Sequence, residues 1–147
     1  MRLALDTNLL VYAEGEGDAM RCGLARALTQ RLPVQRVVLP MQVLGELHHV
    51  LARKFRWPAA RVGAVVREWA DLYGACDSTR TAFDGALELA STHGLGIWDA
   101  LILSVAAEQR CLALVTEDLQ PGFHWRGVTV VNPFTTPVHP LLAGLMG

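Results

Sequence analysis

The stretch L-A-L-D-T-N at residues 3–8 decides the fold, because it joins a strand to a helix through a single carboxylate. The apolar run Leu3 to Leu5 predicts a strand that is buried on both faces. Residues 8–13 then predict a short helix, so Asp6 stands at the carboxyl end of the strand. A buried strand that passes at once into a helix is typical of α/β proteins with a parallel sheet.

Strands and helices alternate along the rest of the chain. Apolar runs predict further strands at residues 36–39, 75–76, 112–115 and 128–131. Apolar periodicity and capping residues predict helices over 18–31, 41–55, 58–73, 80–92 and 98–109. We therefore expect a three-layer α/β/α fold with a parallel sheet of four to five strands. The tail after residue 134 is expected to be irregular, with a short final turn near 141–145.

The composition predicts one folded domain. The 147 residues are 52% hydrophobic and 18% charged, the opposite of a disordered chain. Three scattered cysteines without a C-x-x-C pair argue against a zinc site or a disulfide framework. The start of the chain lacks the features of a leader, and no apolar run is long enough to cross a bilayer, so we expect a cytoplasmic protein without membrane contact.

The net charge of −1 does not indicate a nucleic-acid-binding protein, which is typically basic. If the substrate is a nucleic acid, metal ions or a local basic patch must supply the attraction. Arg53, Lys54 and Arg56 form one small basic cluster beside Trp57. This cluster predicts either phosphate contact with base stacking or simply a solvated helix end. We expect three other tryptophans to be packing residues: Trp69, Trp98 and Trp125.

Four dispersed acids are the candidates for chemistry, and each has a structural alternative. Asp6 and Asp118 follow strands, where a ligand crevice opens in parallel sheets, but they could equally cap a helix or form a turn. Asp99 falls in the first turn of a helix, where the helix dipole favours a carboxylate, so it could simply cap that helix. Glu46 lies within a helix and could be solvated surface. Gly45 before it suggests close packing or the approach of a ligand.

Together the four acids predict a cation site. Carboxylates gathered at one end of a sheet repel one another and raise their pKa values unless cations neutralise them. Hard oxygen ligands favour Mg²⁺ or Mn²⁺ over zinc. Two such ions, roughly 3.5–4 Å apart, can clamp the attacking and leaving oxygens of a phosphodiester.

Several short motifs in this order resemble the PIN domain. They are L-D-T-N at 5–8, the isolated Glu46, W-D-A at 98–100, T-E-D at 116–118 and the stretch at 127–134. With nothing appended, the chain is most similar to the VapC-type toxins, ribonucleases held inactive by an antitoxin. The resemblance implies strand order 3-2-1-4-5, a nuclease domain over 1–134, and a tail, 135–147, that is irregular or part of the same domain.

The resemblance also implies the roles of individual residues. The catalytic and metal-binding residues would be Asp6, Glu46, Asp99 and Asp118, and the supporting residues Thr7, Asn8 and Thr116. The expected protein is a metal-dependent endoribonuclease toxin that takes one or two Mg²⁺ or Mn²⁺ ions, an RNA substrate and a cognate antitoxin, and forms a homodimer. Two alternatives stay open: a PIN-like nuclease of RNA processing without an antitoxin, and a non-catalytic binding domain. Glu117 is expected to stand outside the metal site.

Overall fold

A computed structural model describes residues 1–146 of the chain, so the last residue of the predicted tail lies outside the described residues. Its centre is a six-stranded sheet in the order β3-β2-β1-β4-β6-β5. The strands are β1 (Leu3–Leu5), β2 (Val37–Pro40), β3 (Ala75–Cys76), β4 (Ala113–Val115), β5 (His124–Trp125) and β6 (Val128–Val131). All neighbouring pairs are parallel except β5 and β6, which are antiparallel.

The first strand occupies the middle of the sheet, as the opening stretch predicts. Leu3 lies opposite Val37 on one side and Ala113 on the other. The three residues of β1 are 0% exposed, which is what burial by helices on both faces of a parallel sheet requires. The predicted order 3-2-1-4 is confirmed, and the predicted fifth strand is β6, paired with β4.

The sequence did not predict β5, which adds a short antiparallel edge. Trp125 pairs with Val128 across a two-residue turn. Both turn residues have positive φ angles, 45° at Arg126 and 87° at Gly127. This is the pattern of a type I′ hairpin turn, in which glycine is favoured. A two-residue strand carries no readable alternation, so only the Arg-Gly pair could have indicated it.

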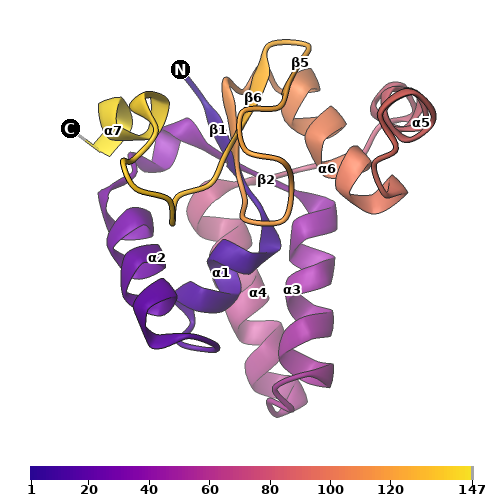
Figure 1. Ribbon diagram of the computed structural model, residues 1–147. Coiled ribbons are helices and arrows are strands. Elements are labelled where there is room, and N and C mark those ends of the chain that lie inside the picture. Colours follow the sequence, from indigo (N-terminus) through magenta and orange to yellow (C-terminus); the bar gives the residue numbers. More distant parts are fainter. Residues whose placement is uncertain (147) are drawn as a thin grey trace.

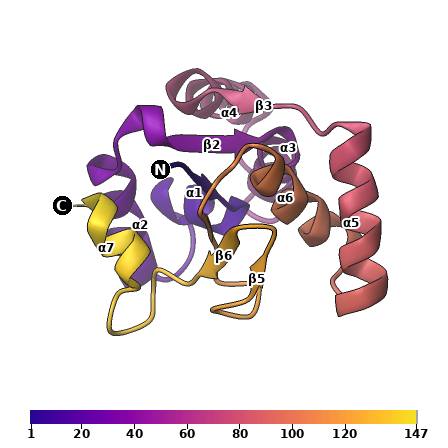
Figure 2. The same ribbon diagram turned by 90° about the horizontal axis from the view of Figure 1, so that it is seen from above.

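Helices cover both faces of the sheet (Figure 1). They are α1 (Thr7–Ala13), α2 (Ala19–Arg31), α3 (Met41–Arg53), α4 (Ala59–Tyr73), α5 (Arg80–His93), α6 (Ile97–Glu108) and α7 (Pro140–Met146). Consecutive helices pack in pairs, α1 with α2, α3 with α4 and α5 with α6. Seen from above, α2 and α7 lie on one side of the molecule and α5 on the other (Figure 2).

Capping residues define the ends of several helices. Asp18 accepts a hydrogen bond from the backbone N–H of Arg21 and begins α2. Thr79 caps α5 in the same way, and Gly94 ends it in the left-handed conformation with φ 70°. Such caps satisfy backbone groups that a helix leaves unpaired at its ends.

A glycine permits the close packing of α5 on α6. A Cβ atom at Gly85 would lie only 2.5 Å from the Ser104 hydroxyl and 3.1 Å from the Trp125 ring. The lack of a side chain therefore sets how near these two helices and the β5 hairpin can approach one another.

The tail is more ordered than the sequence suggests. The expected final turn is the seven-residue helix α7, and its Leu142 is 2% exposed and belongs to the core. The predicted turn near 141–145 is therefore present, and it is longer than expected, spanning Pro140–Met146. Among residues 1–146, no helix combines the length and apolar character needed to cross a membrane.

Candidate functional site

Asp6 is a helix cap and a buried carboxylate at the same time. One oxygen accepts a hydrogen bond from the Thr7 backbone N–H at 2.7 Å, and the other accepts one from the Thr116 hydroxyl, also at 2.7 Å. Asp6 as a whole is only 4% exposed. Burial raises the pKa of Asp6 to about 6, and the charges of Glu46 and Asp118 add to the rise. Asp6 therefore caps α1 and also lies at the carboxyl end of β1, so the two interpretations of this residue are compatible.

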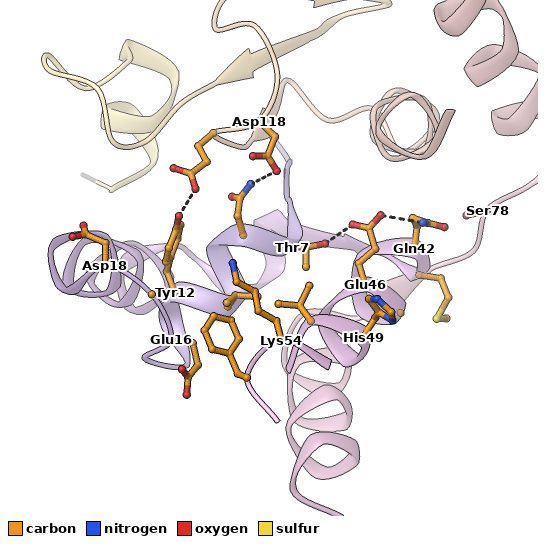
Figure 3. A pocket seen from close by; sticks show the side chains of 18 residues that line it. Thr7, Tyr12, Glu16, Asp18, Gln42, Glu46, His49, Lys54, Ser78 and Asp118 are labelled. Carbon is orange, nitrogen blue, oxygen red and sulfur yellow. Dashed lines mark hydrogen bonds between the residues drawn. The ribbon is translucent and has the colours of Figure 1, made fainter. Parts of the chain in front are cut away.

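Glu46 reaches the same place from α3. One carboxylate oxygen accepts a hydrogen bond from the Thr7 hydroxyl at 2.8 Å, and the other accepts one from Gln42 at 3.1 Å (Figure 3). Thr7 thus binds Asp6 through its backbone and Glu46 through its side chain. A Cβ at Gly45 would meet nothing within 4 Å, so close packing does not explain this glycine. Gly45 instead lines a pocket beside Glu46.

Asp118 is held by Asn8 and Thr116. The Asn8 amide donates to the Asp118 carboxylate at 2.9 Å and to the Thr116 hydroxyl at 3.3 Å. The backbone N–H of Asp118 also donates to the Thr116 hydroxyl, at 3.1 Å. Because the Thr116 hydroxyl donates its hydrogen bond to Asp6, this chain of hydrogen bonds connects Asp118 with Asp6. The side-chain oxygen of Asn8 is buried without a hydrogen-bond partner among the described residues.

Asp99 approaches from the first turn of α6. Its residue is half-buried, and burial raises the pKa of its carboxyl, with further contributions from Glu46 and Asp118. Since Glu46 and Asp118 also act on Asp6, all four carboxylates share one electrostatic field. The fold therefore brings together acids that are up to 112 residues apart in sequence, from Asp6 to Asp118.

These four acids differ from several others in having no basic partner. Among residues 1–146, none of the four is in a salt bridge, whereas arginines pair with the acids Asp18, Asp84, Glu88 and Glu117. Carboxylates without a basic partner suit an external cation, and their oxygen donors suit Mg²⁺ or Mn²⁺.

The carboxylates do not close into a compact ligand set. Within the described part of the chain, no three side chains of Asp, Glu, His or Cys are grouped closely enough to hold a metal by themselves. Mg²⁺ usually binds through one or two carboxylates and keeps several waters. The donor set therefore fits an open, partly hydrated metal site better than a closed protein cage.

A pocket of about 1060 Å³ opens beside the acids. Glu46 and Asp118 line it, whereas Asp6 and Asp99 are not among its lining residues. Its other wall is largely apolar, with Val11, Met41, Val50 and Phe55. Lys54 also lines the pocket, and its ammonium group points toward the side on which Asp118 lies (Figure 3). Glu46 and Asp118 therefore form one rim of a cavity that is large enough for part of a polymer.

Within the predicted basic cluster and its neighbouring tryptophan, Lys54 and Trp57 lie in different surroundings. Lys54 lines the pocket, but Trp57 is only 8% exposed and its indole N–H donates to Glu16 at 2.9 Å. The Arg61 guanidinium covers the Trp57 ring at 3.7 Å from its centroid. The hypothesis that Trp57 stacks on bases is therefore wrong, because Arg61 covers the ring, its N–H is paired and the residue is buried.

Of the other three tryptophans, two are packed and one is exposed. Trp125 is 8% exposed, and Trp69 stacks on Tyr73 with ring centroids 5.8 Å apart, so both are packing residues as expected. Trp98 is 58% exposed, which contradicts the same expectation for this residue. It precedes Asp99 at the start of α6, where its ring faces solvent.

Sequence reasoning missed three residues that hold the acids in place. Gln42 supports Glu46 from one helical turn earlier, a spacing at which side chains meet. That contact was visible in the sequence. Tyr12 and Arg21 both bind Glu117, next to Asp118, and nothing local in the sequence indicates this contact.

Comparisons with known proteins agree with this architecture. A family model described as the PIN domain matches residues 3–123. No curated protein matches the chain. Among solved structures, VapC20 of Mycobacterium tuberculosis, described as a sarcin-ricin loop cleaving toxin, has a TM-score of 0.65 and 21% identity, covering 76% of this chain and 86% of that one.

Two further solved structures share the fold as well. A toxin–antitoxin complex from Klebsiella pneumoniae has a TM-score of 0.67 and 19% identity, covering 91% of this chain and 98% of that one. FitAcB from Neisseria gonorrhoeae has a TM-score of 0.63 and 18% identity, covering 90% and 98%. The family model spans most of the chain, including Asp6, Glu46, Asp99 and Asp118. The chain belongs to the PIN domain family.

Proposed function

We propose that this protein is a metal-dependent endoribonuclease, the toxin of a toxin–antitoxin pair, and that it hydrolyses phosphodiester bonds in RNA. One observation carries the proposal: four carboxylates from separate segments share one field and have no basic partner among residues 1–146. The fold shared with VapC20, described as a sarcin-ricin loop cleaving toxin, supports RNA as the substrate class.

Asp6, Glu46, Asp99 and Asp118 would hold one or two Mg²⁺ or Mn²⁺ ions. When bound, such ions stabilise the charge that develops on a phosphodiester and make water a better nucleophile. The carboxylates thus contribute the negative charge that retains the cations. Lys54 is the lysine that lines the pocket, and it is placed to meet a phosphate of the substrate.

The supporting residues fix the direction in which the acids face. Thr116 donates to Asp6 and accepts from two donors, Asn8 and the Asp118 backbone, so its hydrogen is committed to Asp6. This arrangement favours the ionised form of Asp6, which is the form that binds a cation. Thr7 orients Glu46 in the same manner. Preorganised ligands of this kind lose little freedom when the metal binds.

RNA cleavage by the purified protein tests the proposal directly. With Mg²⁺ or Mn²⁺ we expect cleavage products whose formation stops on chelation, and Asp6→Asn should lose the activity. Asp84→Asn is a matched control, because Asp84 is an acid paired with Arg80 on the surface of α5. Equal cleavage by wild type and Asp6→Asn would rule out the proposed site.

Metal binding separates this enzyme from a non-catalytic domain of the same fold. Calorimetric titration with Mn²⁺ should show binding to the wild type and much weaker binding to Asp6→Asn. A wild type that binds no divalent cation would favour the binding-domain alternative.

The antitoxin partner is part of the proposal. The pocket combines an acidic rim with an apolar wall, which suits a segment carrying basic and apolar side chains. Two of the structures that share the fold, from Klebsiella pneumoniae and Salmonella typhimurium, are a toxin–antitoxin complex and a DNA-bound VapBC. Co-expression with a small open reading frame beside the gene should yield a stable complex without RNA cleavage. No such complex would favour a nuclease of RNA processing.

The proposed homodimer has an independent test. Light scattering on the purified chain should give twice the mass of one 16.0 kDa chain. A monomer at all concentrations would contradict this part of the proposal and leave the nuclease part standing.

A further inference from the structure

Glu117 stands beside Asp118 but is held in an entirely different way. Its side chain is 18% exposed. One carboxylate oxygen accepts a hydrogen bond from the Tyr12 hydroxyl, and the other accepts one from the Arg21 Nε at 2.9 Å. Both carboxylate oxygens are therefore occupied, and the charge is neutralised within the protein.

Phe134 completes the surroundings of this carboxylate. The ring of Tyr12 meets the ring of Phe134 edge to face at 5.5 Å between centroids, and the Arg21 guanidinium lies 5.4 Å from the Phe134 centroid. We call Tyr12, Arg21, Glu117 and Phe134 the Glu117 brace. Its members come from α1, α2, the loop after β4 and the segment after β6. Four separate parts of the chain thus converge on the residue before Asp118.

The chemistry of the brace keeps it assembled at neutral pH. Burial, and then the hydrogen bond to Glu117, raise the pKa of Tyr12 to about 12, so its hydroxyl remains a donor. The same carboxylate raises the pKa of Arg21 above its already high usual value. An exposed ion pair alone would contribute little. Here a charge-assisted bond, a second donor and an aromatic contact act on one carboxylate.

The brace lies on a very short loop. Thr116 is tied to Asp6 and Asp118 is tied to Asn8, so Glu117 is the residue of the T-E-D stretch that faces the helices. Without the bonds from Tyr12 and Arg21 to Glu117, the loop would be held only by the bonds of Thr116 to Asp6 and of Asp118 to Asn8.

We propose that Glu117 is a positioning residue, and that the Glu117 brace sets Asp118 for metal binding. This inference rests on the proposed function and deepens it. The competing explanation is that Glu117 adds its own charge to the metal site. The two explanations differ in sign for Arg21→Ala. Positioning predicts weaker Mn²⁺ binding, whereas a direct charge contribution predicts tighter binding, because Glu117 is no longer neutralised.

A double-mutant cycle on the full chain tests the proposal, with Mn²⁺ affinity measured by calorimetry for Arg21→Ala, Glu117→Ala and the double variant. We expect each single change to weaken binding by about tenfold, the size seen when supporting partners of metal ligands are lost. The double variant should be no weaker than the worse single variant, because both changes break one contact. In RNA cleavage, kcat should fall with KM nearly unchanged.

Two further variants keep the test sharp. Tyr12→Phe retains the ring against Phe134 and removes only the hydroxyl, so it should fold normally and weaken Mn²⁺ binding by about threefold. Arg80→Ala breaks an exposed pair with Asp84 and is the matched control for losing an arginine, with no expected change in Mn²⁺ affinity. Melting temperatures measured without metal show whether any variant is merely less folded.

The outcomes separate this inference from the proposed function. A wild type that binds Mn²⁺ and cleaves RNA, with Arg21→Ala and Glu117→Ala equal to it, overturns the positioning role alone. Tighter binding by Arg21→Ala overturns it in favour of a direct charge contribution. A wild type that neither binds Mn²⁺ nor cleaves RNA overturns both.

Discussion

In two neighbouring regions of this molecule, the carboxylates have different kinds of partners. Around Glu117, an arginine and a tyrosine occupy both oxygens of the acid. Around Asp6, the partners are neutral hydroxyl and backbone donors, and no arginine pairs with it among the described residues. The first arrangement is complete within the protein. The second leaves negative charge that an external cation can neutralise.

The difference also concerns stability. The buried Asp6 carboxylate has a pKa raised to about 6, so keeping it ionised at neutral pH opposes folding. The brace instead joins four segments through complementary charges and aromatic rings. An acid whose ionisation lowers the stability of the metal-free protein is consistent with a functional role.

The largest expected effect comes from removing a charge at the unpaired acids. Asp99→Asn should reduce metal-dependent RNA cleavage by roughly 100-fold or more, because a fixed negative charge that retains the cation is lost. The measurement is kcat/KM with Mn²⁺. Asp71→Asn, an exposed acid on α4, is the control and should cleave like the wild type. Unchanged cleavage by Asp99→Asn would place this residue outside the site.

The second effect is on stability as a function of pH. The folded pKa of Asp6, about 6, is above its ordinary value of 3.8, so the stabilising proton is fully present below about pH 4 and is lost as pH rises through 6. At 1.36 kcal/mol per unit, the metal-free protein should lose up to about 3 kcal/mol from this residue between those limits. Denaturant unfolding in a chelator, at several pH values, measures the change.

Asp6→Asn provides the control for this pH dependence, because it removes the titrating group. The wild type should lose more stability than the variant between pH 5 and 7, and Mn²⁺ should restore part of that loss at pH 7. Identical pH profiles for the two proteins would contradict the raised pKa of Asp6.

A smaller effect is expected where a supporting residue is changed. Thr7→Val removes the hydroxyl that donates to Glu46 at 2.8 Å and leaves the backbone bond to Asp6 in place. Mn²⁺ affinity should fall by about tenfold, as for other partners that orient metal ligands. Thr29→Val, whose hydroxyl bonds only within α2, should leave the affinity unchanged. Equal affinities for both variants would show that Glu46 needs no support.

The smallest effect is expected at a surface pair that belongs to neither region. Arg80 is 87% exposed in its side chain and pairs with Asp84 one helical turn away. Arg80→Ala should change the free energy of unfolding by at most about 0.5 kcal/mol, because solvent screens such pairs. Thermal unfolding checks it. A larger loss would mean that an exposed arginine pair matters as much as the Glu117 brace, and the comparison between the regions would weaken.

Much of the fold could be predicted because it depends on local patterns. The apolar run of β1, the caps at Asp18 and Thr79, and the left-handed Gly94 all announce themselves within a few residues. The two-residue β5 could not be predicted in the same way, and the sequence predicts only a short turn where α7 forms. Each depends on a distant surface to pair with or pack against, and neither carries a periodic pattern long enough to read.

The sequence by itself determined the order of strands and helices, and with it the positions of Asp6, Asp99 and Asp118 at strand ends or a first helical turn. It could not decide what each acid meets, because charges interact through space and their partners lie far away along the chain. Thr7 reaches Glu46 across 39 residues, and Arg21 reaches Glu117 across 96. Only the tertiary structure decided that Glu117 is paired with Arg21 while Asp118, which lines the same pocket, has no basic partner among residues 1–146.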